Sequence, residues 1–454
     1  MADVRVVHLK GDEGSLGGEE LYELAELAEE ADGVIAVGFP SDPCFWECAF
    51  ADLERVGARW PRIVFVDETR DSALSSLSVE ELVALWTAYL EEAAKYVLHV
   101  DLGSSGRFSR RDLLRRGLSL ALRYRPLVDA DAGCYGLRHC LLCLTSCPYS
   151  ALDGKPPAPV KDRCTGCGLC ASSCPSGFLF QPAAPPSAVR KLIAMASEKG
   201  VEEVIVVCPY SRSKAYETPG RRALAVQLPC IASLRVHEYL YARVRRLRVS
   251  FLCSDRECPR RLGAERYLEV IAEVEELFGK PLAPAEPAFF ALPALASMLE
   301  IKAGEARVKQ LSLFYVSVDS ERCSLCSACA RACPSGALKS LEPPGSASLL
   351  FTSSLCVGCG SCAATCPEKA VNVERGVKAG ALKPGHSETL VRGEIARCRL
   401  CGSPIGPLAR IRAVERRLKA VGAPREAIET LYVCGRCRSG ELLKELAESL
   451  RTSR

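Results

Sequence analysis

Two cysteine runs in the second half of the chain constrain its fold more than any other feature. Residues 323–334 read CSLCSACARACP and residues 356–367 read CVGCGSCAATCP, so both follow the pattern C-x2-C-x2-C-x3-C-P. In this pattern the first three thiolates hold three corners of one [4Fe–4S] cube, and the cysteine before the proline reaches the cube of the other run. Since a zinc site needs only four ligands, eight such cysteines predict two cubes within residues 311–380.

The spacing assigns four cysteines to each cube, and each set is named here after one member. The Cys323 group consists of Cys323, Cys326, Cys329 and Cys366. The Cys356 group consists of Cys356, Cys359, Cys362 and Cys333.

An earlier region, residues 129–182, carries one complete run and one incomplete run. Residues 164–175 read CTGCGLCASSCP, a complete run, whereas residues 140–148 read CLLCLTSCP, which supplies only the last three cysteines of the pattern. We therefore expect two further [4Fe–4S] cubes in this region.

The incomplete run leaves the first ligand of its cube open. The pattern places that ligand at Leu137, and Cys134 stands three residues earlier, so a longer loop is expected to deliver Cys134. Without Cys134, the cube would be [3Fe–4S] or would recruit His139. The Cys140 group is assigned as Cys134, Cys140, Cys143 and Cys174. The Cys164 group is assigned as Cys164, Cys167, Cys170 and Cys147.

Composition narrows the class of protein. The 454 residues include 26 cysteines, most of them spaced as C-x2-C, which favours metal thiolates in a reducing compartment over secreted disulfides. The net charge of +4 does not call for nucleic acid as a partner. The first residues lack a signal-peptide core, and no stretch approaches the ~20 apolar residues of a membrane span. We expect a cytoplasmic protein, and the near absence of asparagine and glutamine hints at a thermophilic source.

Residues 1–128 and 187–280 each alternate strand-like and helix-like segments, which predicts a parallel sheet covered by helices. In the first segment we expect strands at Val4–Leu9, Val34–Val37, Ile63–Val66 and Tyr96–Val100, and helices at Glu19–Glu30 and Leu82–Ala94. In the second we expect strands at Val204–Val207, Ala223–Leu228 and Leu247–Leu252, and helices at Val189–Lys199, Val236–Val244 and Arg260–Phe278.

Four cysteines of the second α/β segment follow its predicted strands, and they form the Cys208 group: Cys208, Cys230, Cys253 and Cys258. Ligands of an open parallel sheet bind at the carboxyl ends of its strands. Four thiols that meet there would suit a [2Fe–2S] cluster. The alternative is four thiols buried separately.

The two α/β segments resemble each other. Residues 34–42 read VIAVGFPSD and residues 204–212 read VIVVCPYSR, and each α/β segment precedes a two-cluster segment. This predicts a tandem duplication of an α/β-plus-iron–sulfur unit. Gly38 and Asp101 stand in the first copy where Cys208 and Cys253 stand in the second, so we expect the first copy to have lost its cluster site.

Three shorter segments complete this part of the chain. If residues 44–48 are helical, Cys44 and Cys48 lie on one face of that helix. They would then serve as metal ligands, as a redox pair or as buried packing residues. Proline-rich residues 182–186 predict a stiff linker. Residues 281–310 predict a second linker with a helix over roughly 289–303, followed by a strand at Leu311–Val318.

The last segment, residues 390–454, carries two cysteine pairs, each with a glycine beside it that would permit a tight turn. The Cys398 group consists of Cys398, Cys401, Cys434 and Cys437. Two such pairs predict a zinc-ribbon-like module with structural Zn²⁺, with a rubredoxin-like iron as the rival. A nucleic-acid-binding ribbon with a basic helix at Arg410–Lys419 is a weaker alternative, because few aromatic residues lie nearby.

Two resemblances to known families follow from these motifs. The cysteine runs resemble those of bacterial-type ferredoxins. Residues 204–266 resemble the iron–sulfur delta subunit of methyl-viologen-reducing hydrogenase, which feeds heterodisulfide reductase, through Cys208, Leu228-Pro229-Cys230 and the CSDREC motif that begins at Cys253. That resemblance implies a [2Fe–2S] cluster that passes electrons between a hydrogenase or formate dehydrogenase and a flavoprotein. The chain departs from the family in having one cysteine after the first strand, and Ile231-Ala232 where a glycine is usual.

The fold class expected from these features is α/β plus ferredoxin-like α+β, with two α/β domains, two two-cluster ferredoxin domains and the C-terminal module. The function expected is an electron-transfer subunit of a larger oxidoreductase complex, with four [4Fe–4S] clusters, one [2Fe–2S] cluster and Zn²⁺, and with no catalytic site for a substrate. The alternatives are a thiol/disulfide or sulfur reductase that uses the Cys208 group, and a redox-sensing or assembly protein.

Overall fold

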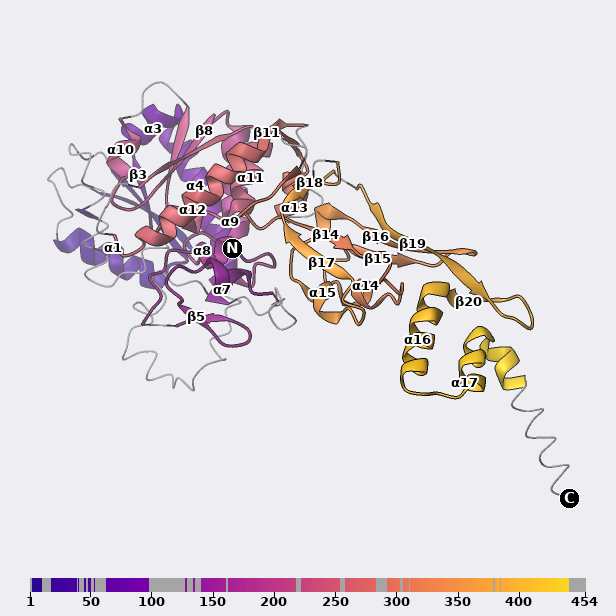
Figure 1. The fold of residues 1–454 in the computed structure, drawn as a ribbon. Coiled ribbons are helices and arrows are strands. Elements are labelled where there is room, and N and C mark those ends of the chain that lie inside the picture. Colours follow the sequence, from indigo (N-terminus) through magenta and orange to yellow (C-terminus); the bar gives the residue numbers. More distant parts are fainter. Residues whose placement is uncertain are drawn as a thin grey trace, which may run out of the picture. The chain divides into compact units, whose positions relative to one another are not determined.

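The computed structural model divides into two compact units, Met1–Ala303 with Val308–Ser312, and Gly304–Arg307 with Leu313–Arg454 (Figure 1). The structure describes residues 2–9, 18–38, 40, 45, 48–49, 53, 63–97, 127–128, 134, 140–160, 162–217, 222–253, 258–282, 292–302, 305–309, 311–378, 380–383 and 385–440.

The first unit begins with a three-stranded parallel sheet of order β1-β2-β3. The strands are β1 (Val4–His8), β2 (Gly33–Gly38) and β3 (Ile63–Asp67), as predicted. Every residue of β2 is buried, because this central strand is covered on both faces. The covering helices include α1 (Gly18–Glu30), α3 (Arg70–Ser75) and α4 (Val79–Val97).

The strand predicted at Tyr96–Val100 is wrong for its first two residues, which end α4. Leu82, Leu85 and Tyr89 recur on one buried face of this helix, and such a stripe carries the helix past Ala94, where the prediction ended it. The remaining residues of the predicted strand lie outside the described ranges.

The second α/β layer also has a three-stranded parallel sheet, of order β10-β8-β9. Its strands, which match the predicted ones, are β8 (Glu203–Val207), β9 (Ala223–Gln227) and β10 (Arg248–Leu252). Its helices are α9 (Pro186–Glu198), α10 (Arg212–Ala215), η3 (Ile231–Ser233), α11 (Val236–Val244) and α12 (Arg261–Leu277). In both sheets the strand that begins the matched sequences is central, but β1 precedes β2 in the chain whereas β10 follows β8, so the duplication stays a prediction.

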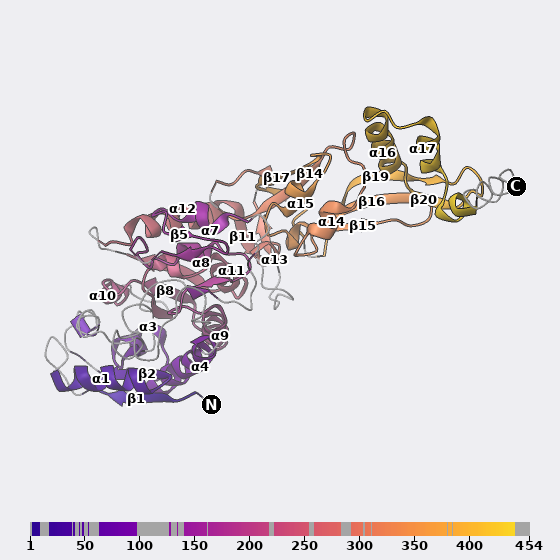
Figure 2. The ribbon, with the colours of Figure 1, turned by 90° about the horizontal axis from the view of Figure 1, so that it is seen from below.

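The two α/β layers pack on each other along α4 and α9 (Figure 2). At the contact Tyr89 donates its hydroxyl proton to the Ala183 carbonyl at 2.8 Å, and Arg212 forms a buried ion pair with Asp71 at 2.7 Å. Residues 182–186 are therefore packed rather than an exposed linker: Ala183 joins the core of the first layer and Pro186 begins α9.

The first iron–sulfur segment has two short helices that contact each other, α7 (Leu142–Ser146) and α8 (Leu169–Ser172). Its strands are β4 (Leu127–Val128), β5 (Leu152–Asp153), β6 (Ala158–Pro159) and β7 (Leu179–Phe180). Helix α8 packs against η3 and α12, so this segment rests on the α/β layer that follows it in sequence.

The first unit ends with β11 (Phe278–Pro281), α13 (Leu292–Ala296) and β12 (Leu299–Ile301). The helix predicted over roughly 289–303 is therefore five residues long among the described residues. Its last part pairs instead as β12 with β11, because main-chain hydrogen bonds across this hairpin replace the last helical turns.

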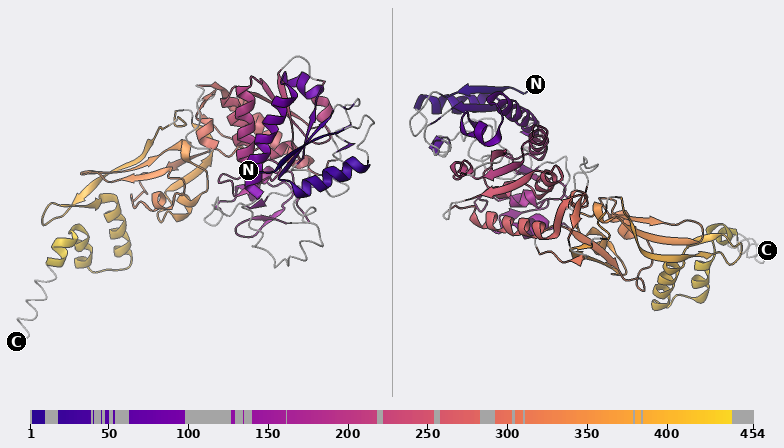
Figure 3. Two further views of the ribbon diagram at one scale, coloured as in Figure 1. Left: turned by 180° about the vertical axis from the view of Figure 1, so that it is seen from behind. Right: turned by 90° about the horizontal axis from the view of Figure 1, so that it is seen from above.

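The second unit holds the second iron–sulfur segment and the C-terminal module (Figure 3). Its helices are α14 (Ala328–Ala332), η4 (Ser353–Leu355), α15 (Ser361–Thr365), α16 (Leu408–Ala420), α17 (Arg425–Glu429) and η5 (Thr430–Tyr432). Its strands are β13 (Glu305–Ala306), β14 (Phe314–Val318), β15 (Leu338–Leu341), β16 (Ser346–Phe351), β17 (Val371–Arg375), β18 (Val377–Lys378), β19 (Glu388–Arg397) and β20 (Pro404–Pro407).

Strand β19 joins the two parts of this unit, because it pairs with β16 on one side and with β20 on the other. Helix α16, the predicted basic helix, packs against β19. No helix in the described part of the chain is long and apolar enough to cross a bilayer.

Candidate metal centres

The three complete cysteine runs share one backbone conformation around their second cysteine. The residues on both sides of it have positive φ: Gly166 and Gly168, Leu325 and Ser327, Gly358 and Gly360. Two left-handed residues, one on each side of the cysteine, bend the main chain into a tight loop, and this loop directs successive cysteines toward a common centre. Glycine adopts this conformation without strain, whereas Leu325 and Ser327 do so at a cost of about 1 kcal/mol each.

The Cys323 group surrounds a hollow lined by all four of its members. The Cys356 group is also gathered: burial, followed by the nearby charges of Cys362, Cys333 and Cys359, raises the pKa of Cys356 to about 12. Each set thus contains the distant cysteine that spacing assigned to it. Four converging thiols fit the donor set of a [4Fe–4S] cube, which takes four thiolates.

The Cys164 group lines a similar hollow in the first unit. The Cys140 group surrounds Cys143, whose pKa is raised to about 12 by burial and then by the charges of Cys174, Cys140 and Cys134. Half-buried Cys134 packs against the same cluster of side chains. The structure therefore places Cys134 with the three cysteines of the incomplete run, and His139 lies outside the described residues.

In each segment, one of the two cysteines that precede a proline accepts a hydrogen bond from the main-chain N–H four residues later. The Ala151 N–H donates to Cys147 Sγ at 3.4 Å, and the Ala370 N–H donates to Cys366 Sγ at 3.3 Å. In each case the donor lies four residues after the cysteine. Such N–H···S bonds stabilise a more negative sulfur and so raise the potential of a bound cluster.

The Cys208 group lies at the carboxyl edge of the second sheet. Strands β10, β8 and β9 end in register at Leu252, Val207 and Gln227, so Cys208 and Cys253 directly follow adjacent strands. The Cys208 N–H donates to the Leu252 carbonyl at 3.2 Å, which fixes Cys208 at the centre of the edge.

The four thiols of this group interact. A hydrogen bond with Cys208, then burial, then the charges of Cys208, Cys230 and Cys258 raise the pKa of Cys253. Cys208 and Cys230 are buried, whereas Cys253 is exposed. The structure thus brings together all four thiols that sequence placed at this edge, in an arrangement with one open side.

The first α/β layer has no cysteine at the matching point, since Gly38 ends β2. Asp67 ends the neighbouring strand β3 and is fully buried, where it accepts hydrogen bonds from the main chain and side chain of Arg70. Of the Cys44–Cys48 pair, Cys48 is exposed and Cys44 lies outside the described residues, as do Asp101 and its surroundings.

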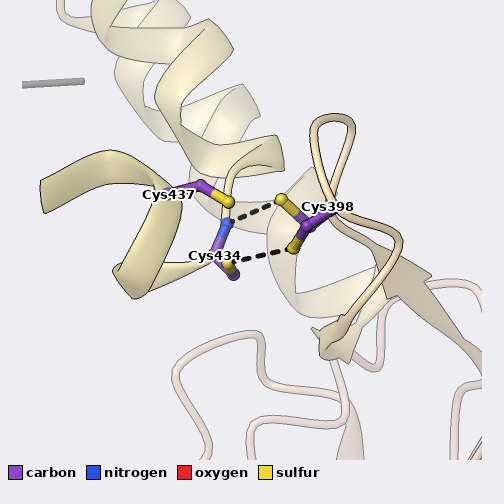
Figure 4. A group of neighbouring side chains, drawn as sticks. Cys398, Cys434 and Cys437 are labelled. Carbon is purple, nitrogen blue, oxygen red and sulfur yellow. Dashed lines mark hydrogen bonds between the residues drawn. The ribbon is translucent and has the colours of Figure 1, made fainter. Parts of the chain in front are cut away.

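The four sulfurs of the Cys398 group all lie within 4.8 Å of one another, and Figure 4 shows three of these cysteines, Cys398, Cys434 and Cys437. The sulfurs of Cys401 and Cys434 lie 3.6 Å apart. Four sulfurs at about 2.3 Å from a central ion would be separated by roughly 3.8 Å, so the site fits one tetrahedral metal ion and is too small for a cube.

Main-chain hydrogen bonds to the sulfurs stabilise the thiolate form that binds a cation. The Cys434 N–H donates to Cys398 Sγ at 3.3 Å, and this bond is the main cause that lowers the pKa of Cys398 to about 6. Gly402 has a φ of +73°, as a tight turn after the first pair requires. Gly435 differs from the expectation, because it begins a helical turn and has no positive φ.

Several residues that support these centres were not anticipated from sequence. Arg260 donates to the Thr165 carbonyl at 3.1 Å, and Arg410 donates to the Leu325 carbonyl at 2.8 Å. Each joins a cysteine loop to an element far away in sequence. The sequence placed Arg260 two residues after Cys258 and Arg410 in the basic helix, but it did not relate either arginine to a cysteine loop.

Comparison with known families agrees with the cysteine runs. Residues 315–367 match the model of a 4Fe-4S dicluster domain, and residues 157–180 match that of a 4Fe-4S binding domain. No curated protein matches the chain. The chain therefore carries two iron–sulfur cluster-binding segments of ferredoxin type, as predicted, while the number of clusters stays a prediction.

Proposed function

We propose that this chain is an electron-transfer subunit of a larger oxidoreductase complex. The observation that carries the proposal is the grouping of cysteines in adjacent sets of four. Cys170 of the Cys164 group lies close enough to Cys143 of the Cys140 group for their charges to interact. Likewise, Cys362 of the Cys356 group lies close enough to Cys329 of the Cys323 group for their charges to interact. Clusters held so close together would exchange single electrons, which is the chemistry that iron–sulfur cubes supply.

The chain's own contribution is placement and tuning. The left-handed loops direct the thiolates, the N–H···S bonds at Cys147 and Cys366 favour the reduced state, and burial of most ligands excludes water. A [2Fe–2S] centre at the Cys208 group is supported by the convergence of four thiols at one sheet edge. Its open side, at exposed Cys253, is the expected point of exchange with a flavoprotein, hydrogenase or formate-dehydrogenase-like partner.

The Cys398 group is proposed to hold Zn²⁺ in a structural role. Four thiols with no open coordination position are typical of structural rather than catalytic zinc. A single iron would fit the same sulfurs, so metal analysis decides between them.

A second candidate function is a thiol/disulfide or sulfur reductase that uses the Cys208 group, since Cys253 is exposed to a substrate. A nucleophilic thiol needs a lowered pKa. The neighbouring thiols and burial raise the pKa of Cys253, which disfavours a free nucleophilic thiolate at this position.

The test is the metal content of the anaerobically purified chain. About 18 iron with matching acid-labile sulfide and about one zinc per chain would support four cubes, a [2Fe–2S] centre and a structural zinc. About 16 iron would leave the Cys208 group as thiols and favour the reductase, to be assayed with a reduced dye and a disulfide. About eight iron or fewer in a fully loaded preparation would contradict the account of the first segment.

A further inference from the structure

The N-terminal end of α12 lies between two cysteine groups that belong to different folds. On one side is the Cys164 group of the first ferredoxin-type segment, and on the other is the Cys208 group of the second α/β layer. Helix α8, which carries Cys170 of the first group, packs against η3, which directly follows Cys230 of the second group, and α12 contacts both elements. Cys167 and Cys230, one from each group, are both buried.

Arg260, the residue that precedes α12, bridges the two groups through their main chains. Its Nε donates to the Thr165 carbonyl at 3.1 Å, and its Nη1 donates to the Pro229 carbonyl at 3.3 Å. Thr165 follows Cys164 in sequence and Pro229 precedes Cys230. Arg260 is 7% exposed, so a fixed positive charge is buried between the two cysteine loops.

Gly263, in the first turn of α12, brings the helix against Cys167. A Cβ at this position would lie 2.6 Å from Cys167 Sγ and 2.7 Å from Cys167 Cβ. The Gly263 N–H also donates to the Tyr149 hydroxyl at 3.2 Å. Because glycine within a helix costs about 1 kcal/mol relative to alanine, its presence here is explained by the close approach that it permits.

A second contact holds the same surfaces together. The Ser233 hydroxyl donates to the Cys167 carbonyl at 3.3 Å, and a Cβ on Gly168 would lie 2.8 Å from Ser233 Cα. Arg235 donates to the Cys174 carbonyl at 3.4 Å. The cysteine loops of the ferredoxin-type segment therefore form its contact with the α/β layer, at the edge of that layer that carries the Cys208 group.

We propose that Arg260 and Gly263 form an electron-transfer junction between the centre of the Cys164 group and the centre of the Cys208 group. The inference rests on the proposed function and adds a route to it. With clusters bound at both groups, one electron would pass from the reduced centre to the oxidised one, and no bond would form or break at the junction. Arg260 acts as a positioning residue whose charge stabilises the reduced state of both centres, while Gly263 sets their separation.

The experiment compares Arg260→Gln with Arg261→Gln in the full-length chain. The second variant removes the same charge one residue along, where Arg261 is exposed and paired with Glu265. We expect Arg260→Gln to lower the reduction potentials of the two adjacent centres in an EPR-monitored titration, and Arg261→Gln to leave them unchanged. Arg260→Lys should recover most of that shift, because it retains the charge.

A separate variant, Gly263→Ala, tests whether Gly263 sets the separation of the two centres. Its methyl group must move Cys167 away by about 1 Å, since carbon atoms in contact lie at 3.5–4.0 Å. We expect weaker magnetic coupling between the two reduced centres at unchanged iron content, and no change in Leu262→Ala, whose side chain is exposed on the same helix.

The outcomes separate this inference from the proposed function. If the wild-type chain binds iron at the Cys208 group, but Arg260→Gln behaves as Arg261→Gln and Gly263→Ala keeps full coupling, the junction is wrong and the function stands. If the wild-type chain binds no iron at the Cys208 group, the junction and the [2Fe–2S] centre fail together, and the ferredoxin-type centres remain.

Discussion

Arg410 donates a hydrogen bond to the main-chain oxygen of Leu325, with Nη2 and the oxygen 2.8 Å apart. Arg410 belongs to α16 of the C-terminal module, and Leu325 is one of the two non-glycine residues held at positive φ in the Cys323 run. The Leu325 side chain is buried, and a Cβ on Gly393 of β19 would lie 2.7 Å from it. The C-terminal module thus supports a strained cysteine loop of the second ferredoxin-type segment.

Replacement of Arg410 should loosen that loop. Arg410→Met removes the bond to Leu325 and the ion pair with Glu342, and leaves the Leu325 carbonyl to water. We expect a loss of about 1–2 kcal/mol in the free energy of unfolding of this segment, followed through the visible absorbance of its clusters in denaturant. Arg416→Met, at an exposed position of the same helix, should change it by less than about 0.5 kcal/mol. Equal effects of the two variants would contradict the proposed support.

Gly358 and Gly360 offer a matched pair within the Cys356 run. Both have positive φ, at +66° and +74°, but a Cβ on Gly358 would overlap the Phe314 ring, whereas a Cβ on Gly360 meets nothing within 4 Å. Gly360→Ala should cost about 1–2 kcal/mol from the backbone alone. Gly358→Ala should cost more, because the buried ring must also move, and should deplete the iron bound by this group. Iron content and thermal unfolding of both variants test this, and similar values would refute the role of Phe314.

Cys134 is expected to be the fourth ligand of the Cys140 group. Cys134→Ala should then remove one iron from that cube and produce the EPR signal of an oxidised [3Fe–4S] cluster. Cys48→Ala, at an exposed cysteine outside all six groups, should leave iron content and spectra unchanged. A Cys134→Ala chain with four complete cubes would show that another residue serves as the ligand.

The buried ion pair between Arg212 and Asp71 should be important for the packing of the two α/β layers. Arg212→Met leaves the Asp71 carboxylate buried without its cation, and a broken buried pair costs about 3–5 kcal/mol. We expect a lower unfolding temperature of the first unit by calorimetry, while the exposed Arg261→Met should have little effect.

The stability lost in Arg212→Met should depend on pH. Burial raises the pKa of Asp71, and the charge of Arg212 opposes that rise. Without Arg212 the folded chain would bind a proton at Asp71 more readily than the unfolded chain does. Stability should therefore recover as pH falls through the raised pKa of Asp71 and decline again as pH rises. A deficit that stays constant from pH 7 to about pH 5 would argue that desolvation of Asp71 is not its cause.

Sequence reasoning was strongest where chemistry repeats at short spacing. The spacing of the complete runs at residues 164–175, 323–334 and 356–367 predicts the [4Fe–4S] type of cluster, because it places three thiolates in one tight loop. The α/β strands followed from short apolar segments, and the Cys208 group followed from the rule that parallel strands end at one edge. Predicted boundaries of helices and strands were wrong where tertiary packing extends an element. Tyr96, for example, continues the packed helix α4 instead of beginning a strand.

The sequence by itself determined which residues gather into sets of four, since spacing of cysteines is a local property of the chain. Only the tertiary structure decided which sets face each other and what supports them. Arg260 lies 95 residues from Thr165, and Arg410 lies 85 residues from Leu325. Nothing in the local sequence relates such pairs, because their hydrogen bonds form only after separate elements have packed and their main-chain carbonyls have been removed from water.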